Sequence, residues 1–388
     1  MEFNIPSSAY VHIPFCRRRC FYCDFPISVV GDQRNGSNSG TIAQYVEKLC
    51  EEIDRSNNFG EPLRTVFFGG GTPSLLSVSQ FQQILDRLDR HLGILSGAEI
   101  SMEIDPGTFD LTQIKGFKSA GTNRVSLGVQ AFQSKLLKAC GRTHTVEDIY
   151  NSIELIHQAD IENYSLDLIS GLPHQTIEIW QDSLDCAIAL SPTHLSVYDL
   201  TIEPQTPFGK QLQPGEKPLP SDELTADLYR FAQQTLTKAG YEHYEISNYA
   251  KPGYQCQHNR AYWENRSFYG FGMGATSYLN GDRVSRPRKL REYYEWIEAP
   301  SSTSEVTEID YLLDRLMVGL RLKEGIDLKD LNKQFGESTI ALILDCLQPY
   351  EKASWVEITP ERIKLTDPEG FLFSNVILTK LFARFDED

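Results

Sequence analysis

Three of the eight cysteines in the sequence stand close together near its start. Cys16, Cys20 and Cys23 are four and three residues apart, directly after the apolar run 9–13. Three thiolates at this spacing can each bind one iron of a 4Fe-4S cube and leave the fourth iron without a protein ligand. That iron can chelate S-adenosyl-L-methionine (SAM), so that one electron from the cluster breaks the sulfonium C–S bond and releases a 5′-deoxyadenosyl radical. The cysteine loop therefore predicts a reactive iron–sulfur centre.

A structural zinc site is the alternative interpretation of the same three cysteines, with His12 as a fourth ligand. Zinc sites usually combine two pairs of closely spaced ligands, and this sequence offers no second pair. The remaining cysteines stand singly, at Cys50, Cys140, Cys186, Cys256 and Cys346. In a reducing compartment such cysteines are small core residues, so the iron–sulfur interpretation is preferred.

The residues around the cysteines resemble a known family. The cysteine spacing is similar to the signature of the radical SAM superfamily. The preceding segment, Tyr-Val-His-Ile-Pro-Phe-Cys at 10–16, resembles the oxygen-independent coproporphyrinogen III oxidases, and the GGGTP run at 69–73 matches the SAM motif of that family. The resemblance implies that the chain carries a 4Fe-4S cluster and binds SAM.

Apolar, β-branched runs alternate with segments of helical period in the first half of the chain, which is the pattern of a parallel sheet with crossover helices. The sequence predicts six strands, at 9–13, 64–68, 99–104, 123–129, 163–169 and 193–198. We therefore expect an α/β fold, an incomplete (β/α)6 TIM-like radical SAM barrel. In such barrels the chemistry lies on loops at the carboxyl ends of the strands, and the cysteine loop follows the first strand.

Polar side chains and glycines gather at the ends of the other predicted strands. A carboxylate or amide there can bind the ribose hydroxyls and the methionine amine of SAM, and an arginine can bind its carboxylate at two points. By resemblance to the family, the SAM-binding residues are Tyr10, Tyr22, Gly70, Gly71, Thr72, Glu103, Gln130, Arg142, Asp167 and Thr201. Taken alone, each polar residue is more typical of a surface cap or a salt bridge, but their common position at strand ends favours binding.

The composition changes after Thr201, where five prolines and two glycines within 203–220 predict a linker or lid. A helix is expected at 222–239. From residue 307, helical periods at 308–322, 328–334 and 339–350 precede short β runs at 355–358 and 362–365 and a last helix at 370–383. This order is typical of a winged helix. We expect three parts: the barrel (1–201), a segment that packs on it (202–300), and an α+β winged-helix-like domain (301–388).

A histidine beside aromatic residues forms a second candidate site. His258, Asn259, Tyr262 and Trp263 resemble the HNxxYW motif that marks the HemW branch of the family, the haem chaperones. The imidazole can present an axial nitrogen to haem iron while the rings lie against the macrocycle, and Cys256 and Met273 are further candidate ligands. The alternative interpretation is a core histidine whose two nitrogens are already hydrogen-bonded.

The overall charge and hydropathy exclude some classes of partner. A net charge of −16, with no long basic run, argues against a protein that binds nucleic acid through its phosphates, and the predicted winged helix has no basic patch. No apolar run approaches the roughly 20 residues that a bilayer span needs, and no signal peptide is recognised. We therefore expect a cytoplasmic protein without a membrane span.

Two functions follow from the resemblance. One is a haem chaperone that binds haem as cargo and transfers it to acceptor haemoproteins, with membrane cytochromes as candidate recipients. The other is the oxidative decarboxylation of coproporphyrinogen III. The oxidases carry a further cysteine where this sequence has Phe25, and a longer N-terminal arm than the fifteen residues before Cys16, so the chaperone is preferred. A zinc-stabilised binding module is the third class.

Overall fold

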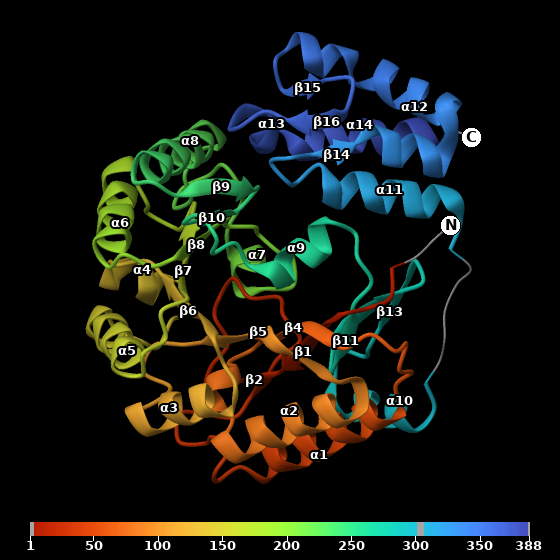
Figure 1. The fold of residues 1–388 in the computed structure, drawn as a ribbon. Coiled ribbons are helices and arrows are strands. Elements are labelled where there is room, and N and C mark those ends of the chain that lie inside the picture. Colours follow the sequence, from red (N-terminus) through yellow and green to blue (C-terminus); the bar gives the residue numbers. More distant parts are fainter. Residues whose placement is uncertain (1–3, 301–305, 387–388) are drawn as a thin grey trace.

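The six predicted strands lie side by side in one sheet. In the computed structural model, which describes residues 4–300 and 306–386, they are β1 (Ser8–Ile13), β4 (Leu63–Gly70), β5 (Ile94–Ile104), β6 (Arg124–Gln130), β7 (Tyr164–Ser170) and β8 (His194–Asp199). They follow in chain order, and each pairs in parallel with the next. Figure 1 shows them as an arc with the helices outside. The predicted incomplete parallel barrel is confirmed.

Helices between the strands cover the outer face of the arc. They are α1 (Gly40–Arg55), α2 (Val78–Leu92), α3 (Leu111–Ala120), α4 (Ser134–Ala139), α5 (Val146–Gln158), α6 (Ile177–Ala189) and α8 (Asp222–Lys238). Several begin at a Ser, Thr or Asp whose side chain accepts a backbone N–H of the first turn, as Ser77 does for α2 and Asp110 for α3. The helices thus start immediately after the loops that carry the polar residues.

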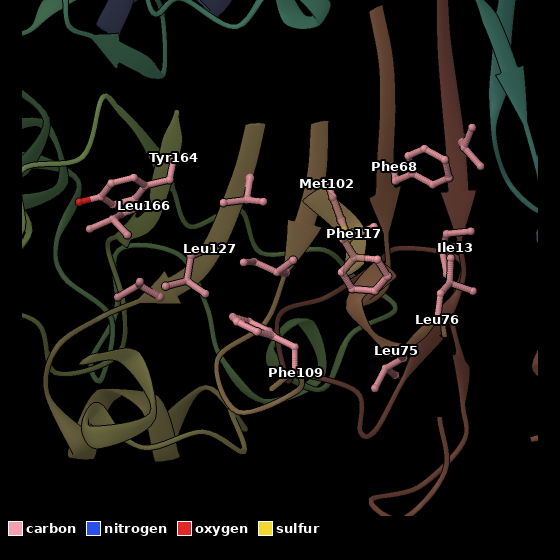
Figure 2. Close-up of a cluster of buried hydrophobic side chains, with 14 of the residues drawn as sticks. Ile13, Phe68, Leu75, Leu76, Met102, Phe109, Phe117, Leu127, Tyr164 and Leu166 are labelled. Carbon is pink, nitrogen blue, oxygen red and sulfur yellow. The ribbon is translucent and has the colours of Figure 1, made fainter. Parts of the chain in front are cut away.

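The strands alternate between an apolar outer face and a polar inner face. On β5, Met102 and Ile104 belong to the buried core, whereas Ser101 and Glu103 alternate with them. Figure 2 shows Met102 beside Phe68 of β4 and Phe117 of α3 in this outer core. Burial of apolar side chains outside therefore leaves the polar side chains inside the arc.

The segment after residue 201 extends the sheet at both edges. Strand β11 (Tyr269–Phe271) pairs in parallel with β1, and β10 (Asn248–Ala250) and β9 (Glu242–Glu245) add antiparallel strands beyond β8. We expected 202–300 to pack on the barrel, but part of it joins the sheet. Strands of three or four residues are too short to show a clear period in the sequence.

The proline-rich segment contains a short helix where we expected only a linker or lid. Helix α7 (Pro207–Gln211) begins at Thr206, whose side chain accepts the N–H of Gly209. Phe208 is buried, and its N–H donates to the carbonyl of Phe21 in the cysteine loop at 3.0 Å. A capping threonine followed by a proline at the first helical position is a signal for the start of a helix. The other prolines of the segment made this signal hard to recognise in the sequence.

The C-terminal part contains most of a second buried core, to which Tyr229 of α8 also contributes. Its elements are α11 (Glu308–Gly319), β14 (Ile326–Asp327), α12 (Leu328–Lys352), β15 (Val356–Ile358), β16 (Arg362–Leu365), α13 (Glu369–Leu372) and α14 (Ser374–Asp386). Helix α12 is broken at Gly336, so it represents two of the three predicted helices, and β14 adds a strand to the predicted ribbon. The predicted boundary after residue 300 adjoins 301–305, outside the described residues.

Candidate functional site

A cavity of about 560 Å³ lies at the carboxyl ends of the parallel strands. We call it the barrel cavity. Its lining includes all three clustered cysteines and nine of the ten predicted SAM residues, namely Cys16, Cys20, Cys23, Tyr22, Gly70, Gly71, Thr72, Glu103, Gln130, Arg142, Asp167 and Thr201. Parallel strands bring their carboxyl ends to one edge of the sheet, so residues far apart in the sequence meet there.

The cysteine loop is closed by a short pair of parallel strands, β2 (Phe15–Cys16) and β3 (Ser28–Val29). Within the loop the N–H of Cys23 donates to the carbonyl of Cys20 at 3.3 Å. The N–H of Phe21 donates to the carbonyl of Cys140 at 2.9 Å, which ties the loop to the end of α4. Backbone contacts therefore hold the three thiols over the barrel.

Side chains from the barrel contact two of the thiols. The Thr72 hydroxyl donates to the Cys16 sulfur at 3.7 Å, and Arg142 Nη1 lies 3.6 Å from the Cys20 sulfur. Hydrogen-bond donors and a guanidinium stabilise an anionic thiolate more than a neutral thiol. These contacts suit thiols that bind metal as thiolates.

The thiols fit a cluster better than a single ion. Burial, and next the Asp105 carboxylate, raise the pKa of Cys16 to about 12, and burial also raises the pKa of Cys23. Such thiols keep their protons until a metal replaces them. His12, the fourth ligand considered for zinc, has both ring nitrogens beside other partners, with Nδ1 3.1 Å from the Tyr10 hydroxyl and Nε2 2.9 Å from the Pro26 carbonyl. Three thiolates without His12 match a 4Fe-4S cube, in which each thiolate binds its own iron.

Asp105 connects the predicted SAM residues with each other. Its carboxylate accepts hydrogen bonds from Arg142 Nη2 and, at 3.1 Å, from the Thr72 hydroxyl. Arg142 Nη2 also donates to the carbonyl of Gly128 at 2.9 Å. We did not select Asp105 from the sequence. The signal was its position two residues after Glu103, on the same face of the chain.

Two buried carboxyl groups in the lining of the barrel cavity interact through their charges. Glu103 accepts the N–H of Gly70 at 2.9 Å, and Asp167 accepts the hydroxyl of Ser126 at 2.8 Å. Burial, and next the charge of Asp167, raise the pKa of Glu103 to about 7, and burial also raises the pKa of Asp167. A cation bound beside these groups relieves their repulsion, so the pair suits an ammonium group.

The glycine run is constrained by packing as well as by any ligand. Gly70 has a φ of 111°, and a Cβ there would lie 2.4 Å from the His12 ring. A Cβ on Gly71 would lie 2.7 Å from the carbonyl oxygen of Phe15, and the Gly71 N–H donates to Ile13 at 2.9 Å. The run therefore needs glycine to lie against the strand that leads into the cysteine loop.

Tyr10 does not line the barrel cavity. It lines a second cavity of about 440 Å³, together with Tyr262, Tyr278 and Met317. We call it the hairpin cavity, because the hairpin of β12 (Thr276–Leu279) and β13 (Asp282–Ser285) forms one wall. The Tyr10 hydroxyl lies 3.1 Å from His12 Nδ1.

The HNxxYW segment forms helix α9 (Gln257–Trp263), which lies between the sheet and α11 (Figure 1). The carboxylate of Glu99, on the inner face of β5, accepts the N–H groups of Gln257 at 3.1 Å and His258 at 3.2 Å. An acceptor at a helix start satisfies amides that the helix itself leaves free. The motif is thus anchored inside the barrel.

Both nitrogens of His258 are hydrogen-bonded. Nδ1 lies 2.8 Å from the Thr65 hydroxyl, and Nε2 lies 2.8 Å from the Tyr262 hydroxyl. The ring is buried and stacks on Phe67, and burial lowers its pKa to about 3. In this structure the imidazole presents neither nitrogen to a cavity. His258 therefore has the geometry of a core histidine whose two nitrogens are already hydrogen-bonded.

The other residues considered for haem differ in position. Tyr262 and Trp263 line the hairpin cavity, whereas Asn259 is in the lining of neither cavity. Cys256 is buried and its thiol donates to Glu99 at 3.6 Å, and Met273 is buried as well. The aromatic part of the motif therefore faces a cavity, and the histidine lies behind it.

Comparison with known proteins places this geometry in a family. The Radical SAM superfamily matches residues 10–187, and the HemN C-terminal domain matches residues 306–373. "Heme chaperone HemW" of Synechocystis sp. is 48% identical over 99% of this chain and 98% of its own length, and that of Bacillus subtilis is 34% identical over 96% and 98%. The structure of coproporphyrinogen III oxidase (HemN) from Escherichia coli superposes with a TM-score of 0.82 at 24% identity, covering 99% of this chain and 90% of that chain. The chain therefore belongs to the heme chaperone HemW family within the radical SAM superfamily.

Proposed function

We propose that this protein is a haem chaperone, which binds haem and passes it to acceptor haemoproteins, and that Cys16, Cys20 and Cys23 hold a 4Fe-4S cluster beside bound SAM. The observation that carries the cluster and SAM is the meeting of all three thiols and nine predicted SAM residues in the barrel cavity. The haem function is supported by relatives named heme chaperone along nearly the full chain.

Different residues of the barrel cavity bind different groups of SAM. Glu103 and Asp167 supply carboxylates for the methionine ammonium and the ribose hydroxyls, and Arg142 supplies a guanidinium for the methionine carboxylate. Asp105 keeps Arg142 in place beside Cys20. When bound, the cluster supplies one electron to the sulfonium of SAM.

Transfer requires that the protein meets its acceptors without staying attached to them. No helix of the described residues is long and apolar enough to cross a bilayer. With membrane cytochromes as recipients, docking at the bilayer is transient. We also propose a reducing compartment, the cytoplasm, because the eight cysteines are all unpaired and the cluster is oxygen-sensitive.

One experiment separates haem carriage from decarboxylation. The protein is reconstituted without oxygen and titrated with haem, with and without SAM, and the same sample is supplied with coproporphyrinogen III and a reductant. We expect one cluster per chain, saturable haem binding and no protoporphyrinogen IX. Decarboxylation in the absence of haem binding would overturn the chaperone function and favour the oxidase.

A further inference from the structure

We infer that haem is held in the hairpin cavity, between α9, the β12–β13 hairpin and α11, with Arg266 and Arg283 binding its propionates. This inference rests on the proposed function and gives the cargo a site. The cavity has a volume of about 440 Å³. Pockets for small organic ligands are typically about 300–1,000 Å³.

The walls of the cavity suit a flat aromatic ring system. Tyr262 and Trp263 come from α9, Phe268 from the loop after it, and Tyr278 from the hairpin. Tyr262 and Phe268 meet edge to face with ring centroids 4.5 Å apart, and Phe268 and Tyr278 are 6.1 Å apart. Such a group of rings offers both faces and edges for stacking against a macrocycle.

The charged side chains that line the hairpin cavity are basic. Arg266, Arg283 and Arg288 line the hairpin cavity, and no Asp or Glu is found among the described residues of its lining. His12, also in the lining, stays neutral because burial lowers its pKa to about 4. In a chain of net charge −16, a cavity with only positive side chains indicates an anionic ligand.

The existing partners of these arginines leave room for a ligand. Arg283 Nε contacts Asp314 at 3.0 Å, Arg288 contacts Asp24 at 3.1 Å, and Arg266 pairs with Glu264. The three arginine side chains are 39%, 59% and 50% exposed, and exposed ion pairs contribute little to stability. Each guanidinium has five N–H donors, so a propionate can bind beside or in place of the present carboxylate.

The hairpin cavity adjoins the barrel cavity. Phe25 and Arg288 belong to the lining of both. Phe25 is 60% exposed although it is a large apolar side chain, and it stands where the two cavities meet. Haem in the hairpin cavity thus lies next to the iron–sulfur centre, with Phe25 available to cover its edge.

The test is a haem titration of the reconstituted full chain, followed by the Soret band and by quenching of tryptophan fluorescence. The double variant Arg266→Gln and Arg283→Gln removes two cations from partly exposed positions, so we expect it to fold, and far-UV circular dichroism checks this. We expect its haem affinity to fall roughly tenfold or more, because charge-assisted hydrogen bonds are lost. Met317→Trp, which fills the cavity from α11, should also weaken binding.

The matched control is Arg291→Gln, because Arg291 lines neither cavity and its side chain is 91% exposed, paired with Glu295. It should bind haem like the unaltered protein, and all variants should keep the visible absorption of the cluster. If the unaltered protein binds haem but both cavity variants bind it equally well, the site is wrong while the chaperone function stands. If the unaltered protein binds no haem, the proposed function itself fails.

Discussion

The two adjoining cavities are built and charged in different ways. The barrel cavity collects side chains from the ends of successive parallel strands, and carboxylates such as Glu103, Asp105 and Asp167 alternate there with arginines. The hairpin cavity is assembled from β1, α9, the hairpin and α11, and its charged lining is basic. The first suits a metal cluster and a ligand with both charges, and the second suits an anion with a large apolar surface.

The largest expected effect is the loss of the cluster without loss of haem binding. Cys20→Ala removes one of three ligands, so the visible absorption of the cluster and the bound iron should disappear. Haem affinity should stay close to that of the unaltered protein, because Cys20 lines only the barrel cavity. Cys346→Ala, in the C-terminal part, is the control and should retain the cluster. Unchanged absorption in Cys20→Ala would refute the ligand assignment.

The second largest effect is expected from Glu99, because it anchors α9, a wall of the hairpin cavity. Glu99 is 7% exposed, anchors the start of α9, and interacts with the charge of Arg124, which is 1% exposed. Glu99→Gln removes one of the carboxylates that act on this buried charge, Asp167 being another, and weakens the contacts with the start of α9, so the free energy of unfolding should fall by about 2 kcal/mol. Urea unfolding measures this loss, and Glu162→Gln, at an exposed site, should show none.

Glu99→Gln should also weaken haem binding more than SAM binding, because α9 forms a wall of the hairpin cavity only. Equal losses for both ligands would show that the two cavities do not behave as separate sites.

SAM binding should depend on pH through Glu103, whose pKa is raised to about 7. Below that pH the carboxyl is protonated and cannot bind an ammonium, so SAM affinity should rise as the pH passes upward through about 7 and then level off. Without ligand the folded state holds this proton more tightly than the unfolded chain, so stability should fall as the pH rises from about 4.3 to 7. Calorimetric titration at several pH values tests this, and Glu103→Gln should flatten the profile. Haem affinity should show no matching step.

The smallest effect concerns His258. Tyr262→Phe removes the hydroxyl bonded to Nε2, and the unpaired nitrogen should cost about 1 kcal/mol of stability. The Soret maximum of haem-saturated protein should stay in place in this variant and in His258→Ala, since the ring faces Thr65 and Tyr262 rather than a cavity. A displaced Soret band in His258→Ala alone would make His258 an iron ligand and contradict this.

The barrel could be predicted from the sequence because long β-branched runs and strand-end polar residues are local signals. The hydrogen bonding of His258 could not be predicted, because one of its partners is Thr65, which is 193 residues away. Tyr10 was expected at SAM but lines the other cavity, since its ring stacks on Phe67 within the arc. The hairpin cavity itself has no local signal: its walls come from segments between Tyr10 and Val318 that meet only in the folded chain.

The alternation along β5 also bears on how such a protein diverges. Apolar outer positions such as Met102 accept exchange for side chains of similar volume at little cost, and this leaves the opposite face untouched. Glu103 on that face, which lines the barrel cavity, can change selectivity without disturbing the packing beneath the helices. On one strand, the residues that stabilise the fold and the residues that contact a ligand can therefore change independently of each other.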